Sequence, residues 1–137
     1  MKKYIYILIF TLALSACDKV YINGELDGMW KLQQVECGNE IHHPTDIYYS
    51  FQRHMAQIGK YYEEGLPLRF IGNMKYMDNT LTIGGFRKFL EEEHVCSLEE
   101  LQQFYLYDET TTFIIDKLDD ELLIMHKGNR RYTLNKW

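Results

Sequence analysis

The chain has 137 residues, with Lys+Arg 15 against Asp+Glu 20 and a net charge of -5 at pH 7. This length suits one domain, and a hydrophobic share of 46% excludes a disordered or collagen-like chain. An aromatic share of 15% with only 2 Pro favours strands joined by tight turns. The lack of a basic excess argues against nucleic acid as a partner.

The first residues predict export. Lys2 and Lys3 precede an apolar run over 4–14, which is shorter than the roughly 20 residues that a membrane-spanning helix needs. The run ends in Leu14-Ser15-Ala16-Cys17, which resembles the lipobox of bacterial lipoproteins. In that motif the cysteine is lipidated and becomes the new amino terminus.

This resemblance implies a signal peptide over 1–16 and a lipidated tether over 17–27. Several acyl chains on Cys17 would hold the protein durably on a bilayer. We therefore expect a domain over 28–137 in the cell envelope, tied by Cys17 to a membrane that we expect to be the outer membrane, on its periplasmic side or its surface.

The first half of the mature chain predicts strands separated by loops. A first strand is expected over 28–36 and a loop over 37–45. Alternating apolar and polar residues predict one strand over 46–57 and another over 68–76.

Turn signals continue this pattern. Asp78-Asn79 predicts a tight turn before a strand over 80–89. Within that strand, Gly84-Gly85 predicts a bulge or sharp bend of the kind that barrels use to close.

One segment departs from the strand pattern. Ser97-Leu98-Glu99-Glu100 forms a capping box, so a short amphipathic helix is expected over 97–107. Strands over 110–117, 121–127 and 130–136 follow, with hairpin turns at Asp119-Asp120 and Gly128-Asn129.

These elements predict an all-β, mainly antiparallel meander with one short helix. A sheet of about seven to nine strands in one domain must close or stack, because an open sheet leaves unpaired edges. Gly28-x-Trp30 at the start of the first strand, the meander, the short helix and an arginine in the last strand resemble the lipocalins and related calycins. More closely, the chain resembles the short lipocalin-like lipoproteins of diderm bacteria, whose roles are mostly undefined.

The resemblance implies a barrel closed at one end by Trp30, with an arginine across its ring in a cation-π contact. Alternation places Arg130 on the same face as Tyr132 and Leu134, so Arg130 is the expected arginine. Arg131 remains an alternative.

A lipocalin-like barrel also implies an inward face that either binds a small apolar ligand or fills the interior. The predicted ligand-binding residues are aromatic side chains and methionines on alternating positions, namely Tyr49, Phe51, Met55, Phe70, Met74 and Tyr76. Ile114, Ile124 and Met125 are expected to add to this lining.

Two cysteines remain beside Cys17. Cys37 and Cys96 would face an oxidising compartment, so a disulfide between them is possible. The alternative is two unpaired, buried thiols.

Motifs for catalysis are weak, so we expect no enzyme, no cofactor and no metal site. Glu40, His42, His43 and Asp46 are expected to form a solvated turn, and Glu91-Glu92-Glu93 a solvated face. No nucleophile elbow or phosphate-binding glycine loop occurs. The remaining hypotheses are a tethered protein that binds a small hydrophobic or amphipathic molecule and a filled-core module that binds another envelope protein.

Overall fold

The computed structural model describes residues 22–137, so the predicted signal peptide, Cys17 and residues 18–21 of the predicted tether lie outside the described residues. The elements in chain order are η1 (Gly24–Leu26), β1 (Gly28–Cys37), β2 (Glu40–His42), β3 (Ile47–Gln52), β4 (Met55–Lys60), β5 (Leu68–Met77), β6 (Thr80–Lys88), β7 (Glu91–Val95), α2 (Leu98–Gln102), β8 (Thr110–Leu118), β9 (Leu122–Lys127) and β10 (Arg130–Lys136). The all-β, antiparallel fold with a short helix is confirmed.

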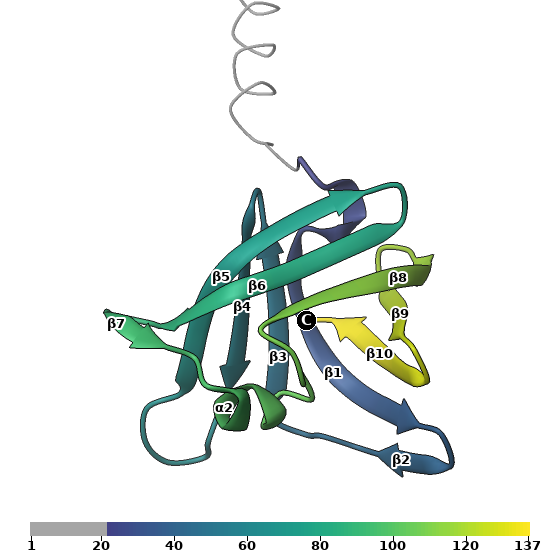
Figure 1. The fold of residues 1–137 in the computed structure, drawn as a ribbon. Coiled ribbons are helices and arrows are strands. Elements are labelled where there is room, and N and C mark those ends of the chain that lie inside the picture. The colour runs from purple at the N-terminus through teal and green to yellow at the C-terminus, as the bar shows by residue number, and fades with distance from the viewer. Residues whose placement is uncertain (1–21) are drawn as a thin grey trace, which may run out of the picture.

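Eight of these strands form a closed barrel (Figure 1). Their order is β1, β3, β4, β5, β6, β8, β9 and β10, and β10 pairs with β1 to complete the ring. The closing register runs antiparallel from Trp30 opposite Lys136 to Cys37 opposite Arg130. The short strands β2 and β7 extend this barrel by pairing with β1 and β6. Closure removes the free edges that an open meander would expose.

Two expectations about the first half of the chain are wrong. The single strand expected over 46–57 is a hairpin of β3 and β4, because Arg53 adopts a left-handed φ of 56° and turns the chain. The loop expected over 37–45 contains the short strand β2. A two-residue turn between similar strands leaves little trace in the hydrophobic pattern, so the sequence did not show it.

The other predicted turns are confirmed. Asp78 and Asn79 both have positive φ, at 53° and 59°, as a tight hairpin turn of the primed type requires. Gly85 has a φ of 65°, and the register of β5 with β6 shifts beside it. A side chain on Gly72 would come within 2.4 Å of the Gly84 carbonyl oxygen. The bulge predicted at Gly84-Gly85 therefore depends on close backbone approach.

The capping box of the helix is also confirmed. The Glu100 amide donates to Ser97 Oγ at 3.2 Å, and the Ser97 amide donates to Glu100 Oε1 at 3.1 Å. Helix α2 ends at Gln102, however, earlier than expected. Tyr105 has a φ of 63°, which bends the following segment across one end of the barrel.

Residues 23–27, directly before β1, pack against the barrel. Leu26 in η1 is fully buried in the core, and Asp27 is also buried. Asp27 accepts hydrogen bonds from the amide and the side chain of Asn23. These contacts hold the described start of the chain at the beginning of β1.

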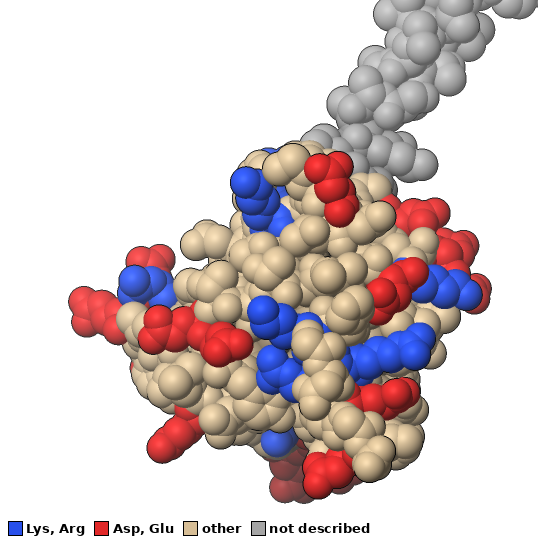
Figure 2. All heavy atoms as spheres, turned by 45° about the vertical axis from the view of Figure 1, so that its right-hand side comes forward, with Lys and Arg blue, Asp and Glu red and all other residues tan. Residues whose placement is uncertain are grey.

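The outer surface carries charges of both signs, interspersed over the face that Figure 2 shows. Within residues 22–137, no helix has the length and apolar character needed to cross a membrane.

Candidate binding site

The interior of the barrel is filled with side chains. Its core is formed by buried residues from all eight ring strands and from the two helical segments. The largest fully buried side chains are Trp30, Tyr49, Tyr132, Phe51, Phe70, Phe104 and Phe113. Aromatic rings also pack on one another, as in the edge contact of Phe113 with Tyr132 at 5.0 Å between ring centroids. The inward face therefore serves as the core of the domain.

Four of the six predicted ligand-binding residues lie in this interior, namely Tyr49, Phe51, Phe70 and Met74. Tyr76 is half-buried at its edge. Met55 is 43% exposed, so its predicted inward placement is wrong. Across the Arg53-His54 turn, the inward-facing positions change from odd-numbered residues in β3 to even-numbered residues in β4. Ala56 rather than Met55 therefore faces inward, opposite Phe51.

The three residues expected to add to this lining also differ in whether they face the interior. Met125 is fully buried, Ile124 is half-buried and Ile114 is exposed on the outer face. In β8 the inward positions are Thr111, Phe113 and Ile115.

One end of the barrel, which we call the anchor end, is closed by Trp30. Its ring is fully buried, and its Nε1 donates to the Leu26 carbonyl at 2.8 Å. Lys136 Nζ lies 4.5 Å from the centroid of the Trp30 ring and donates to the carbonyls of Glu25 and Asp27. Burial lowers the pKa of Lys136, and the nearby carboxylates of Asp27 and Glu25 oppose this effect.

The expected contact of Arg130 with Trp30 is wrong, because Lys136 occupies that position. Since β10 runs antiparallel to β1, the beginning of β10 lies beside Cys37 and not beside Trp30. The Arg130 guanidinium instead lies 4.4 Å from the centroid of the Tyr107 ring. Arg131, the alternative, lies opposite Glu36 in the register of β10 with β1 and is also distant from Trp30.

The opposite end, which we call the distal end, is closed by α2 and the residues that follow it. Leu101, Phe104 and Leu106 are buried in the core. The Tyr49 hydroxyl donates to the Phe104 carbonyl, and the Tyr132 hydroxyl donates to the Tyr105 carbonyl. Burial raises the pKa of both tyrosines, so both hydroxyls stay protonated and keep donating. We call residues 97–106 the plug.

Cys37 and Cys96 are free thiols, and the possible disulfide between them is not formed. Cys37 ends β1, whereas the Cys96 amide bonds to Phe86 in β6. Because three strands separate β1 from β6 on either path around the ring, the two cysteines belong to opposite walls. Burial raises the pKa of Cys96 to about 12, which makes that thiol a poor nucleophile.

The polar segment after β1 does not bring together side chains that could bind a metal ion. His42 lies 3.5 Å from Glu40 and packs its ring against Tyr105, while His43 is exposed. Across residues 22–137, no group of three His, Cys, Asp or Glu residues is placed to hold a metal ion. Glu91, Glu92 and Glu93 are exposed along β7.

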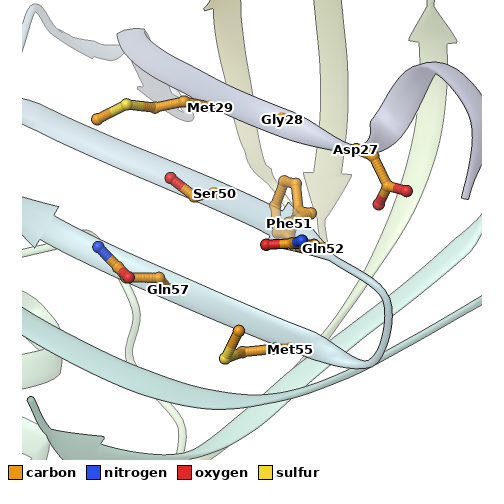
Figure 3. A pocket seen from close by; sticks show the side chains of 8 residues that line it. All are labelled: Asp27, Gly28, Met29, Ser50, Phe51, Gln52, Met55 and Gln57. Atoms are coloured by element: carbon orange, nitrogen blue, oxygen red, sulfur yellow. The ribbon is translucent and has the colours of Figure 1, made fainter. Parts of the chain in front are cut away.

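Hollows lie on the outer wall. Figure 3 shows one of about 220 Å³ at the anchor end, lined by Met29, Ser50, Gln57 and Met55 from β1, β3 and β4 together with Asp27, Gly28, Phe51 and Gln52. Its volume is below the range of 300 to 1,000 Å³ typical of ligand sites. Its lining includes the side-chain amides of glutamines and the thioethers of methionines, but no lysine or arginine.

A larger hollow of about 520 Å³ lies at the distal end, between the loop over 61–67 and the hairpin of β6 with β7. We call it the distal hollow. It is lined by Tyr62, Leu66, Pro67, Leu68, Arg69, Lys88, Phe89, Leu90 and Glu91. A second hollow adjoins it through Lys88, Phe89 and Leu90. Leu66 and Leu90 are 90% and 85% exposed, so they project from their loops instead of packing.

Two cations face this apolar hollow. Arg69 lies over the Phe89 ring, 3.9 Å from its centroid, and Lys88 pairs with Glu91 at 3.0 Å. Among the described residues, no carboxylate pairs with Arg69 and no side-chain hydrogen bond of its guanidinium is formed. The guanidinium therefore presents its donors to whatever enters the hollow.

Little in the sequence indicates the distal hollow. Arg69 occurs as an ordinary outward residue of an alternating strand, and its stacking on Phe89 depends on the pairing of β5 with the end of β6. One usable signal is that Leu66 and Leu90 occupy turns, where a large apolar side chain has no core to enter.

The closed eight-stranded meander and its Trp30-capped end define the class of protein as a lipocalin-type barrel. A family profile described as a lipocalin-like domain matches residues 12–137, and the chain belongs to this family. Such barrels generally bind small molecules without catalysis.

Solved structures support the fold. A lipocalin-like protein from Bacteroides uniformis superimposes with a TM-score of 0.68 at 19% identity, over 83% of this chain and 100% of that chain. An uncharacterized protein from Bacteroides eggerthii gives a TM-score of 0.67 at 19% identity, over 82% of this chain and 99% of that one. No curated protein matches this chain.

Proposed function

We propose that this protein is a membrane-anchored lipoprotein of the cell envelope that binds a small amphipathic molecule without catalysis. The acyl groups on Cys17 hold it to the membrane, which we take to be the outer membrane. The ligand has an apolar body and an anionic head, and it occupies the distal hollow at the rim of the barrel. The site lies outside the filled interior.

The observation that carries this proposal is the free guanidinium of Arg69 in an apolar hollow of about 520 Å³. The guanidinium lies against the Phe89 ring, and its donors can bind a carboxylate or phosphate. Leu66 and Leu90 lie beside it and can cover the apolar body. Their removal from water upon binding supplies the hydrophobic part of the affinity.

Binding of dodecanoate and of uncharged dodecanol, measured by calorimetry, tests the role of Arg69. We expect Arg69→Gln to weaken dodecanoate binding by about tenfold or more, because a charge-assisted hydrogen bond is lost. Dodecanol binding should change little. The matched control is Arg131→Gln, since Arg131 is an exposed arginine away from the hollow.

Leu66→Ser and Leu90→Ser should weaken the binding of both dodecanoate and dodecanol. Neither should change the stability of the fold, because both side chains are exposed. Equal binding of dodecanoate to wild type and Arg69→Gln would contradict the site. The anchor is tested separately, since mass spectrometry should find acyl groups on Cys17 and Cys17→Ser should release the protein from membranes.

A second candidate function is an envelope module that binds another protein. The filled interior favours it, together with β7, whose five residues are all exposed and which pairs with β6 alone. Capture of a defined envelope protein by wild type, lost when His94→Pro blocks the β7 edge, would support this function.

A further inference from the structure

Exposed apolar side chains surround the point where the described chain begins. Ile22 is 56% exposed and Met77 is 54% exposed, and both line one hollow together with His54. Met55 lies on the other side of the β3–β4 turn and lines the hollow of Figure 3. The Asn23 side chain joins these segments by donating to the Arg53 carbonyl at 2.9 Å. We call Ile22, Met55 and Met77 the anchor rim.

The anchor rim makes no contribution to the core. Met55 follows the β3–β4 turn and Met77 precedes the β5–β6 turn, positions at which barrels usually carry polar residues. Three large apolar side chains from separate segments, gathered at one end and directed to solvent, are typical of a surface that contacts a partner.

Charges are distributed unevenly around the same end. Arg53 and Lys75 lie beside the anchor rim, together with the carboxylates of Asp78 and Asp27. The β8–β9 turn, which follows the β5–β6 turn around this end, carries Asp119, Asp120 and Glu121 without such a balance of cations in the turn itself. An anionic lipid surface would therefore repel the β8–β9 turn more than the anchor rim.

The length of chain outside the structure identifies the partner. Only residues 18–21 separate Cys17 from Ile22, so an extended tether reaches about 18 Å at most. If Cys17 carries acyl chains, as proposed above, the anchor end stays within that distance of the lipid headgroups. No other part of the described chain is held so close to the membrane by the tether.

We propose that the anchor rim inserts into the headgroup region of the membrane that holds Cys17. The barrel then stands on its Trp30 end, tilted so that the β8–β9 turn is raised from the lipid. The distal hollow faces away from the membrane and is open to molecules in the envelope. This inference rests on the lipid anchor of the proposed function and adds a second contact with the same bilayer.

Tryptophan variants of the acylated full chain test this orientation. Met77→Trp adds an indole at the anchor rim, and Leu90→Trp adds one at an exposed turn of the distal end. Each variant is reconstituted in vesicles of phosphatidylethanolamine, phosphatidylglycerol and a phosphatidylcholine brominated near its headgroup. We expect quenching of the added emission to be roughly twofold or more stronger for Met77→Trp, because interfacial side chains lie at the depth of the bromine atoms. Equal quenching, or stronger quenching of Leu90→Trp, overturns the inference.

A second measurement needs no substitution in the barrel. Peroxide should oxidise Met55 and Met77 several-fold more slowly in the vesicle-bound wild type than in the Cys17→Ser chain without vesicles. The internal control is the fully buried Met125, whose oxidation should be equally slow in both samples. Mass spectrometry of the same samples separates the two proposals. Acylated Cys17 with unprotected methionines overturns the membrane contact alone, whereas a chain without acyl groups overturns the anchor and the contact together.

Discussion

The two ends of the barrel are both closed, but by different means. At the anchor end, Trp30 is held by Leu26, four residues earlier in the chain, and covered by Lys136 from the last strand. At the distal end, Tyr49 and Tyr132 donate to the plug from positions 55 and 27 residues away. The anchor end therefore depends on one large buried ring, and the distal end depends on hydrogen bonds between the barrel wall and a separate segment.

This difference predicts different responses to change. Loss of the Trp30 ring removes apolar volume from the core, and the whole domain should lose stability. Loss of a tyrosine hydroxyl at the distal end leaves the ring in place and removes only the attachment of the plug. The distal end should then open locally before the barrel unfolds.

The largest effect is expected for Trp30→Ala. The substitution leaves a cavity at a fully buried position and removes the hydrogen bond to Leu26, so the free energy of unfolding should fall by about 3 to 5 kcal/mol. Urea unfolding measures this change. Trp137→Ala is the control, because Trp137 is exposed and should change stability by less than about 0.5 kcal/mol. A loss below about 1 kcal/mol for Trp30→Ala would show that the ring does not hold this end closed.

An intermediate effect is expected for Tyr49→Phe. The Phe104 carbonyl loses its donor from the barrel wall, which should cost about 1 to 3 kcal/mol. Hydrogen exchange should speed up in residues 97–106, with β1 and β10 nearly unchanged. Tyr48→Phe, on the outer face of the same strand, is the matched control. Uniformly faster exchange through all strands would contradict a local role for this hydroxyl.

The smallest effect is expected for the charge on Glu100. Partial burial alone would raise its pKa, but hydrogen bonds from His94 and Ser97 outweigh this and lower the pKa of Glu100. A lowered pKa in the folded state stabilises the domain above the pKa of the unfolded chain. This stabilisation is lost as the pH falls below about 4.

Glu100→Gln should therefore remove under about 1 kcal/mol of stability at pH 7, since the carboxylate is close to solvent. Wild type and variant should converge in acid, where both side chains are neutral. Thermal unfolding at a series of pH values measures this convergence, with Glu99→Gln as the control. A constant difference across the series would mean that the charge of Glu100 plays no part.

The sequence predicted most of the fold because its signals are local. Alternation, the Asp78-Asn79 turn, the glycine pair in β6 and the capping box each involve neighbouring residues, and the structure has all of them. The Arg53-His54 turn was missed because apolar residues continue on both sides of it.

Long-range register was harder to predict. Alternation within the last strand predicts Arg130, with Arg131 as the alternative, for the contact with Trp30, whereas the placement of Lys136 there depends on the antiparallel pairing of β10 with β1. The filled interior and the stacking of Arg69 on Phe89 also depend on which strands become neighbours. Such contacts have no signature within a short window of sequence.

The pairing of β1 with β10 also determines when the domain can complete its fold. Lys136 and Asp27, which meet at this seam, are 109 residues apart in the chain. The final wall of the barrel can form only after the last strand has been synthesised, and contacts of such long range form slowly. Until then the chain exposes two unpaired strand edges, so we expect the incomplete barrel to be prone to aggregation.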